Sequence, residues 1–536
     1  MCDMETRRRY PAGVQDFETI IQEGFVYVDK TRYIYDLANN YGNAIFLSRP
    51  RRFGKSLLCS TMKYYFLGRR DLFEGLSIDH LECRWSRHPV LQLSMANVKS
   101  REPEVVASNI SALLRRYEVT YGSDPANTTL GQRFAHLIAQ AHAVTGEKAV
   151  VIIDEYDAPV LHVIDDDAKM SAVRNIFNEF YPPLKDEAEH LRFVFITGIT
   201  KFSQMSIFST INHLKNISML KQFEGLCGIT AQELEQDFQP EIAALASAQE
   251  CSADEALHKL RKQYDGYHFG PGLTDVFNPF SLLNAFDDLQ LKDYWFGPGT
   301  PSSLIKVLGN YRFDLADVEG TIATEGDFDQ PFDNFDTAIP VLYQSGYLTI
   351  KDYDKQMDAY TLGVPNGEVY RGLYRTLMEH YLNGNTNANS KLLLSVKRAM
   401  LDDDINAALT AVQSYMAALP HHLSNKTEQD FETILRVLFD GIGIEVETEV
   451  ESAYGRCDVV IKTARFLYVI EIKTDGNGSV DDALRQISDK NYLIAYWDDP
   501  RPKVKVGVVM DRTTRTLKEW KVMSPSKEQK LQERRE

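Results

Sequence analysis

Three mostly apolar runs in the first part of the chain predict strands of a buried sheet. The runs are Ala44–Leu47, Ala149–Ile153 and Leu191–Ile196, and each is followed directly by polar residues. Short runs with little polar alternation are typical of strands that are covered on both faces. An amphipathic segment from Ser56 to Phe66 follows the first run and predicts a helix. A strand that leads into a helix in this way indicates an α/β core.

The segment between the first run and this helix has the residues of a phosphate-binding loop. It reads RPRRFGKSLL from Arg49 to Leu58. In such a loop, backbone N–H groups and a helix N-terminus surround the phosphates, a Lys reaches the outer ones, and a Ser or Thr hydroxyl ligates Mg²⁺. Gly54, Lys55 and Ser56 fill these positions, but Arg49 stands where the full pattern has its first glycine. The alternative is a basic turn that Ser56 caps.

Acidic residues follow the second run, and residues 148–157 together read KAVVIIDEYD. A buried strand of this kind can deliver Asp154 to a Mg²⁺ ion and place Glu155 beside the attacking water. The third run leads into Thr197 and Thr200, which are candidates for a polar sensor of the γ-phosphate. The alternative for this segment is a strand-end turn that uses Gly198.

Several longer strings carry a resemblance to a known family. They are YVDKT, SRPRRFGKSLL, VVIIDEYDAPV, FITGITKFSQMSIFSTINHL, YDGYHF and VFNPFSLL, in this order. Residues 10 to about 350 resemble the AAA-ATPase-like family of bacterial proteins, which is related to the signal-transducing NTPases. The resemblance implies a P-loop NTPase core with a parallel sheet, with ATP and Mg²⁺ as cofactors. It implies Glu155 as a catalytic residue, Ser56 and Asp154 as metal ligands, and cofactor binding by Arg52, Phe53, Gly54, Lys55, Ser56, Leu57, Asp154 and Thr197.

The chain beyond this core is divided by breaks in the helical pattern. Ile229 to Leu291 alternates helical segments with turns, which predicts a helical lid. Residues 338–370 read as a helix and two short strands, as in a winged-helix unit. A winged helix can bind DNA, but no basic recognition helix is visible, which favours a lid. Residues 371–424 predict a helical connector, in which the adjacent His421 and His422 indicate a loop and not a metal site.

A second set of chemically active residues follows the connector. The pattern predicts strands at Glu445–Glu451, Gly455–Ile461 and Phe466–Ile472 and a helix at Val480–Ile487. Asp458 begins one apolar strand, while Glu471 and Lys473 alternate with apolar residues on the next and so point to one face. Two carboxylates from neighbouring strands suit Mg²⁺, and Lys473 could hold the nucleophilic water or stabilise charge in the transition state. The alternative is an ordinary half-exposed strand, on which charged and apolar residues also alternate.

The strings GRCDVVI, VIEIKTD and ALRQI resemble the D, E-x-K and helical Q positions of the PD-(D/E)XK nuclease superfamily. The resemblance covers residues 425 to about 510, and Cys457 replaces the Pro that can precede the first Asp. It implies a restriction-endonuclease-like α/β domain with Mg²⁺ on Asp458 and Glu471. The implied catalytic residues are Glu428, Asp458, Glu471, Lys473 and Gln486, with Glu432 as the alternative to Glu428.

Composition adds limits on the class and location of the protein. The 536 residues are 44% hydrophobic and 25% charged, which suggests two or three domains of ordinary globular composition. No apolar run is long enough for a membrane span and the first residues lack the apolar stretch of a signal peptide, so we expect a cytoplasmic protein. The six cysteines form no C-x-x-C pair, so neither a disulfide framework nor a zinc site is indicated.

The net charge limits how the chain can meet nucleic acid. A charge of −17 argues against a broad surface that coats nucleic acid without regard to sequence. Residues 425–523 are nearly balanced, with 15 Lys and Arg against 18 Asp and Glu, and so could approach a phosphate backbone. The alternative is a solvated face of mixed charge. Basic residues gather near the end of this region, at Lys503, Lys505, Arg512, Arg515, Lys518 and Lys521.

The sequence therefore predicts an ATP-binding enzyme in which ATP binding or turnover controls a Mg²⁺-dependent nuclease that acts on nucleic acid, with DNA expected. The alternative is a non-catalytic switch that binds ATP and a partner, and homo-oligomerisation is left open. The predicted segments are an NTPase core (1–228), a helical and winged-helix-like lid (229–370), a helical connector (371–424), a nuclease-like domain (425–523) and a polar tail (524–536).

Overall fold

A computed structural model of the chain contains two compact units, Met1–Val369 and Tyr370–Glu536. The described residues are 8–200, 214–295, 319–328, 339–373, 386–417 and 435–524, the last range without 436–437, 440–441, 443, 453–454, 512 and 515. Within these ranges, no helix is both long and apolar enough to cross a membrane.

A five-stranded sheet forms the centre of the first unit. Its strands are β1 (Ala44–Ser48), β2 (Val90–Ser94), β3 (Ala149–Asp154), β4 (Leu191–Gly198) and β5 (Lys215–Asn216), in the order β2-β3-β4-β1-β5. Every neighbouring pair is parallel, which confirms the predicted parallel sheet and its three predicted strands. Because parallel strands end at the same edge of a sheet, the polar residues that follow β1, β3 and β4 come together there.

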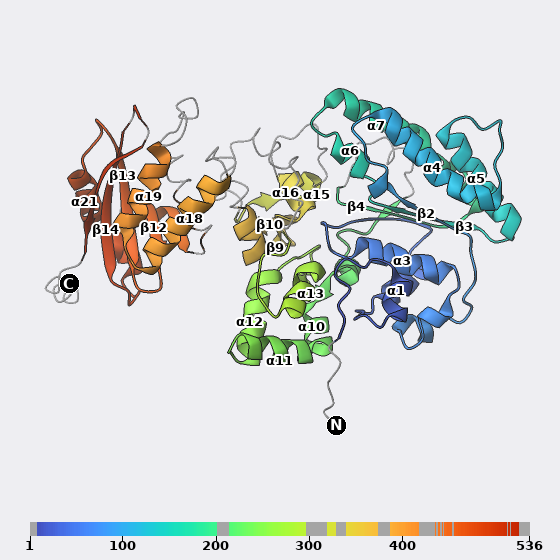
Figure 1. Cartoon of the computed structure of the whole chain (residues 1–536), viewed down its shortest axis with the longest axis horizontal. Helices are drawn as coiled ribbons and strands as arrows, with labels where there is room; N and C mark the ends of the chain where they lie inside the picture. Colours follow the sequence, from blue (N-terminus) through green and yellow to red (C-terminus); the bar gives the residue numbers. More distant parts are fainter. Residues whose placement is uncertain are drawn as a thin grey trace. The chain divides into compact units, whose positions relative to one another are not determined.

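Helices cover both faces of this sheet (Figure 1). One face carries α4 (Pro103–Tyr121), α5 (Leu130–Thr145) and α7 (Asp167–Phe180), and the other carries α1 (Phe17–Gln22) and α3 (Lys55–Phe66). Short helices complete the core at α2 (Thr31–Asn40), α6 (Ala158–His162) and α8 (Pro183–Asp186). Side chains such as Ile110, Leu137 and Phe177 are fully buried beside Val151 of the sheet, and each such burial stabilises the fold by about 1.5–3 kcal/mol.

Four helices follow the core, in the segment for which the sequence predicts a helical lid, and this segment is called the lid below. They are α10 (Ala231–Asp237), α11 (Gln239–Ala248), α12 (Ala253–Tyr264) and α13 (Pro279–Asp288). They share one apolar cluster that includes Leu234, Leu260 and Phe286, together with Val26 from the start of the chain. The Asn278 side chain caps α13 by accepting hydrogen bonds from two backbone N–H groups, which fixes where this helix begins.

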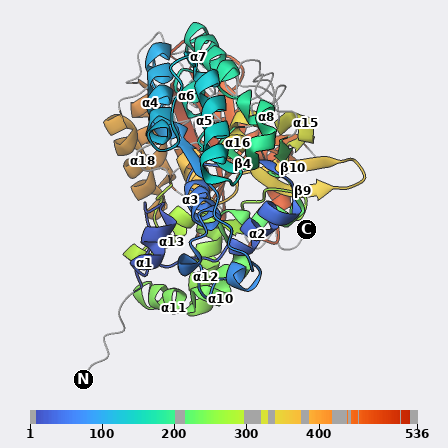
Figure 2. The ribbon, with the colours of Figure 1, turned by 90° about the vertical axis from the view of Figure 1, so that its right-hand side faces the viewer.

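The rest of the first unit holds the predicted helix and two strands. Its elements are β8 (Ile322–Ala323), α15 (Glu325–Phe328), α16 (Ile339–Ser345), β9 (Thr349–Asp354) and β10 (Ala359–Gly363), with an antiparallel sheet in the order β8-β10-β9. The β9–β10 hairpin extends outward from its surroundings (Figure 2). His268 joins this part to the lid, because its Nδ1 lies 2.7 Å from the carbonyl oxygen of Ile350.

Asp265, directly after α12, is a buried acid that makes stability depend on pH. It is 7% exposed, and burial is the main cause that raises its pKa from 3.8 to about 6. Between about pH 4 and 6, the Asp265 carboxyl is still protonated in the folded chain but already ionised in the unfolded chain. The free energy of unfolding therefore falls as pH rises through this range. We expect Asp265→Asn to raise the free energy of unfolding by about 3 kcal/mol at pH 8 and about half as much at pH 5. Urea denaturation at both pH values measures this, and an equal gain at both would contradict it.

The second unit is built on a mixed five-stranded sheet. Its strands are β11 (Glu445–Ser452), β12 (Gly455–Lys462), β13 (Leu467–Thr474), β14 (Lys503–Met510) and β15 (Leu517–Met523), in sequence order across the sheet. Only β13 and β14 run parallel, and the other neighbouring pairs are antiparallel. The mixed sheet agrees with the α/β domain predicted for this region.

Helices lie on both faces of the second sheet as well (Figure 1). On one face, α21 (Val480–Asp489) packs against β14 at Gly507, where an added Cβ would lie 2.5 Å from the Val480 carbonyl oxygen. On the other face are α18 (Thr386–Leu401) and α19 (Ile405–Ala417), whose Asn406 accepts a hydrogen bond from Trp520 Nε1 at 3.1 Å. The helices of the predicted connector therefore pack in the same unit as the nuclease-like sheet.

Candidate functional sites

The predicted phosphate loop joins β1 to α3 and ends at Gly54, which has a φ of 88°. This left-handed conformation favours glycine. The next residue, Lys55, is buried, and its Nζ donates to the carbonyl oxygens of Arg49 and Pro50 at 2.8 Å each. Burial lowers the pKa of Lys55, against the attraction of nearby carboxylates. The ammonium group therefore lies at the N-terminus of a helix, where an anion is also favoured.

Arg49, in the position of the missing glycine, anchors the loop. The residue is only 2% exposed. Its guanidinium donates to the carbonyl oxygens of Ser218 at 2.7 Å and Phe223 at 3.0 Å, and lies 4.3 Å from the centre of the Phe269 ring. These contacts tie the loop to the chain after β5 and to the YDGYHF segment. They account for an arginine at this position without excluding phosphate binding by the rest of the loop.

Ser56 and Asp154 are far apart in sequence, but the Ser56 hydroxyl lies beside the Asp154 carboxyl and acts to lower its pKa. Asp154 is the last residue of β3 and is 5% exposed. Burial raises the pKa of Asp154, although the neighbouring Ser56 hydroxyl and the charge of Lys55 oppose the change. In the described part of the chain, Asp154 Oδ1 has no hydrogen-bond partner. A buried carboxylate oxygen beside a hydroxyl fits Mg²⁺, which takes one or two carboxylates together with water and phosphate oxygens.

Glu155 follows Asp154 in a backbone conformation that is uncommon for a residue with a side chain. Its φ is 51°, in the left-handed region. Burial, and then the charge of Asp154, raise the pKa of Glu155. The next N–H group, that of Tyr156, donates to the carbonyl oxygen of Thr197 at 3.1 Å and so fixes this turn against β4. A strained backbone held by its surroundings is typical of functional sites.

The two candidate threonines after the third predicted strand have different surroundings. Thr200 donates to Asp157 Oδ2 from both its N–H and its hydroxyl, at 2.7 Å each, and the N–H of Ile199 donates to the same oxygen at 2.9 Å. Asp157 is therefore a buried cap for this turn, a role that the motifs did not indicate. Thr197 is fully buried, and its hydroxyl has no hydrogen-bond partner within the described ranges. This leaves Thr197 as the better candidate for a sensor.

An apolar cavity of about 90 Å³ opens beside the first turns of α3. A helix N-terminus next to apolar walls suits a ligand with an aromatic base and a phosphate group. Sequence motifs point to Phe53, Gly54 and Leu57, but the remaining walls come from segments far away in the sequence. Those further walls include Val26, Val28, Ile229 and Leu283.

Asp458 and Glu471 lie on the neighbouring antiparallel strands β12 and β13. The pair Val459 and Ile470 stands directly beside them in the ladder. Asp458 Oδ2 accepts the backbone N–H of Ile472 at 2.6 Å, so this carboxylate links the two strands. Glu471 is almost fully buried, with 1% of its surface exposed. The structure therefore brings the two acids of the predicted motif to adjacent strands.

Glu471 also forms a polar cluster with Lys473 and Gln486. Lys473 Nζ donates to Glu471 Oε1 at 2.8 Å, and Gln486 Nε2 donates to the same oxygen. Gln486 Nε2 also donates to the hydroxyl of Tyr492 at 3.1 Å, at the start of η7 (Tyr492–Tyr496). The helix α21 brings Gln486 to this position because it packs on β13 and β14. Tyr492 is a member of the cluster that the motifs did not indicate.

The predicted acid of the preceding helix, Glu428 or Glu432, lies outside the described residues. Within the residues that are described, no group of three or more His, Cys, Asp or Glu could hold a metal ion. Asp458 and Glu471 supply two carboxylates, the number that Mg²⁺ commonly takes from a protein while water and phosphate oxygens complete its shell. The donor set thus fits Mg²⁺.

Comparisons with known proteins agree with this division of the chain. A family model described as "Predicted AAA-ATPase" matches residues 11–208, and one described as "PD-(D/E)XK nuclease superfamily" matches residues 426–520. The "Uncharacterized protein in vnfD 5'region" of Azotobacter chroococcum mcd 1 is 32% identical over 522 residues, which cover 96% of this chain and 98% of that protein. No solved structure matches the chain. The similarity to this relative therefore extends over both units.

Proposed function

The chain belongs to the predicted AAA-ATPase family and carries a C-terminal domain of the PD-(D/E)XK nuclease superfamily, and on this basis we propose that it is an ATPase that controls its own Mg²⁺-dependent nuclease. The proposed substrate is nucleic acid, and we expect it to be DNA. ATP binding or turnover changes the arrangement of the lid, and this change sets the activity of the nuclease domain.

The observation that supports this proposal is that motif residues distant in sequence are in contact in both units. In the first unit, the Ser56 hydroxyl lies beside the Asp154 carboxyl and acts to lower its pKa. Lys473 and Gln486 both donate to Glu471 in the second. Mutual geometry of this kind is the test that separates a working site from a chance motif.

In the proposed nucleotide site, the loop N–H groups and the Lys55 ammonium bind the phosphates. Ser56 and Asp154 would hold Mg²⁺, whose charge offsets that of the phosphate oxygens. Thr197 donates a hydrogen bond to the γ-phosphate, and Glu155 orients the attacking water. The base of the nucleotide enters the apolar cavity beside Leu57.

In the proposed nuclease site, Asp458 and Glu471 would hold Mg²⁺, which supplies charge for the phosphodiester and lowers the pKa of a bound water. Lys473 orients the nucleophilic water or stabilises the charge that grows on the phosphate. Gln486 keeps the Glu471 carboxylate in place. The oxygen of water bonds to phosphorus while the bond to the leaving oxygen breaks, which leaves one phosphate monoester end and one hydroxyl end.

Cleavage of plasmid DNA, single-stranded DNA and RNA by the purified full chain tests this function. We expect cutting that requires Mg²⁺, stops with a chelator and changes in rate when ATP is added. The Lys55→Ala variant should cut at one rate with and without ATP, because Lys55 acts only in the nucleotide site.

A full chain that binds ATP but cuts nothing with Mg²⁺ or Mn²⁺ would contradict the nuclease. It would favour a nucleotide-dependent switch whose second unit binds a partner or nucleic acid without cutting. The feature in favour of that alternative is the missing first glycine of the loop, and the burial of Arg49 accounts for this departure.

A further inference from the structure

Arg52, in the phosphate loop, has a backbone conformation that rarely suits a residue with a side chain. Its φ is 67°, and that of Gly54, two residues later, is 88°. Left-handed residues in such a loop turn neighbouring N–H groups toward one point, where an anion binds. For any residue except glycine this conformation costs free energy, so the surroundings must hold it.

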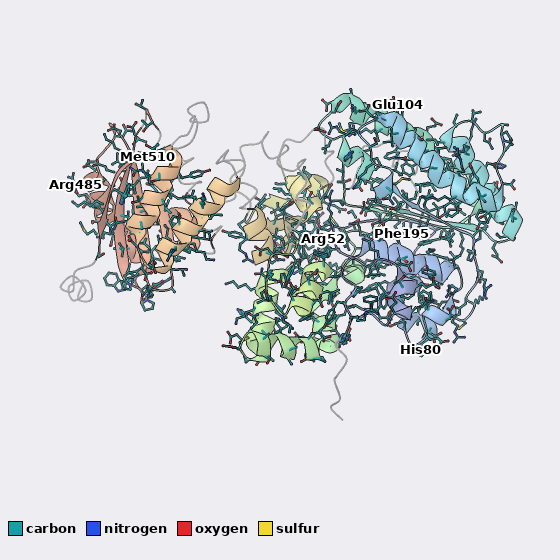
Figure 3. The ribbon with its side chains drawn as sticks, in the orientation of Figure 1. Arg52, His80, Glu104, Phe195, Arg485 and Met510 are labelled. Carbon is teal, nitrogen blue, oxygen red and sulfur yellow. The ribbon has the colours of Figure 1, made fainter. Side chains whose placement is uncertain are left out.

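The Arg52 side chain is held by the lid. Its Nη1 donates to the carbonyl oxygens of Tyr294 at 2.9 Å and Trp295 at 3.3 Å. Its guanidinium carbon lies 4.0 Å from the centre of the Phe280 ring, at the start of α13. Figure 3 shows Arg52 between the core that contains the sheet and the helices of the lid. The guanidinium thus makes two hydrogen bonds and one ring contact with the lid.

Trp295 contacts the loop through its side chain as well as its backbone, and other residues of the first unit hold it in place. Its Nε1 donates to the carbonyl oxygen of Arg51 at 3.4 Å, and its ring packs edge-on against Tyr347 with 5.1 Å between centres. Its backbone N–H donates to Glu368 Oε1 at 2.6 Å, and Glu368 is only 1% exposed. Arg52 and Glu368 therefore hold the backbone of this segment from its carbonyl side and its N–H side.

Gly346 lets a third segment of the lid approach the loop. Its φ is 86°, and an added Cβ would lie 2.7 Å from Cβ of Pro50. Each loop residue from Pro50 to Arg52 is thus in contact with the chain that follows the core. The conformation of these three residues depends on where the lid lies.

We propose that Arg52 is a positioning residue that, with Trp295 and Glu368, forms a clasp holding the loop in the conformation that binds nucleoside phosphates. The inference rests on the proposed ATP binding and adds that the lid sets the affinity of that site. The Arg52 side chain binds the lid, and the backbone N–H groups of the loop remain directed at the phosphates. The family resemblance alone would assign Arg52 to direct cofactor binding.

The clasp also reaches the end of the first unit. Glu368 stands next to Val369, and the second unit begins at Tyr370. A change in the clasp when nucleotide binds therefore acts on the chain that leads into the second unit, first into its connector helices. This continuity gives the proposed control of the nuclease a covalent route.

The variants Arg52→Ala and Arg52→Gly separate a positioning role from direct phosphate binding. Both remove the guanidinium, but only glycine adopts the left-handed conformation without cost. We expect Arg52→Gly to bind ATP about fivefold more tightly than Arg52→Ala, a factor equal to about 1 kcal/mol. Titration calorimetry on the full chain measures both affinities. Equal losses in the two variants would mean that the guanidinium binds phosphate directly, and would overturn the inference.

Trp295→Ala tests the clasp from the side of the lid. In the parent chain it should weaken ATP binding about fivefold, because Arg52 is no longer held. In the Arg52→Gly background the same change should cost less than about twofold, since glycine does not need the clasp. The same loss in both backgrounds would overturn the coupling. This comparison decides the question even where Arg52→Ala does not fold.

Glu250→Gly is the matched control. Glu250 has a φ of 52° in an exposed position after α11, away from the loop. Its replacement by glycine should leave ATP affinity unchanged, and a change would show that the glycine effect is not specific to the loop. A parent chain that binds no ATP would contradict the proposed function, whereas equal Arg52 variants in an ATP-binding chain would contradict only the clasp.

Discussion

Asp458→Ala and Glu471→Ala are each expected to abolish cleavage of nucleic acid, a loss of at least about 1,000-fold. Each change removes one of the two carboxylates that would hold Mg²⁺ beside a phosphodiester. Asp458 also accepts the N–H of Ile472, so its removal could act through the sheet. Asp458→Asn keeps an acceptor for that N–H group while it removes the charge, and it should be as inactive as the Ala variant. Quantified cleavage of plasmid DNA under single-turnover conditions measures all three.

Lys473→Ala is expected to slow cleavage by about 100- to 1,000-fold without weakening metal binding, because the ammonium acts on charge in the transition state. Asp475→Ala is the matched control. This exposed acid lies two residues further on and pairs with Lys518 at 3.0 Å, outside the Glu471 cluster. It should cut at the parental rate. Cleavage that survives the loss of both Asp458 and Glu471 would place the active site elsewhere or reveal a contaminating nuclease.

The elements predicted most accurately are those whose sequence reflects burial on both faces. β1, β3 and β4 are mostly apolar because helices cover the sheet on both sides. β2 was not predicted, since Gln92 interrupts its short apolar pattern, and β5 has only two residues. In the second unit the predicted strand Phe466–Ile472 and the observed β13 differ by one residue at the start and two at the end.

The residues that motifs missed are those whose roles depend on packing between distant segments. Asp157 looks like one more acid after β3, yet it caps the turn at Thr200. Trp295 and Glu368 stand in no motif. Trp295 contacts the loop at the carbonyl oxygen of Arg51, and Glu368 accepts the backbone N–H of Trp295. No spacing rule relates residues so far apart in the chain.

Arg49 shows how the structure changes the reading of a departure from a motif. In the sequence alone, Arg49 stands where the loop pattern has its first glycine, and this departure favours a protein that binds ATP as a switch without catalysis. The Arg49 side chain is buried and donates to three carbonyl oxygens, those of Ser48, Ser218 and Phe223, so it stabilises the loop and leaves the N–H groups near Gly54 in place. The chemistry proposed for the site depends on Lys55, Ser56 and Asp154, which are all present.

Glu155→Gln is expected to slow ATP hydrolysis by about 100- to 10,000-fold and to change ATP affinity by less than about threefold. Gln has nearly the same size and can keep the left-handed conformation at this position, but it cannot accept a proton from water. Lys55→Ala should show the opposite pattern, with ATP bound about 10- to 100-fold more weakly because a charged hydrogen bond to phosphate is lost. Calorimetry gives the affinities and phosphate release gives the rates.

The same variant separates ATP binding from ATP turnover as the signal to the nuclease. Because Glu155→Gln should hold ATP without consuming it, a nuclease rate that responds to ATP as in the parent would assign control to binding. A response that disappears would assign control to turnover. Hydrolysis at the parental rate would contradict the role proposed for Glu155, and its left-handed backbone would then serve only the turn that Tyr156 fixes against β4.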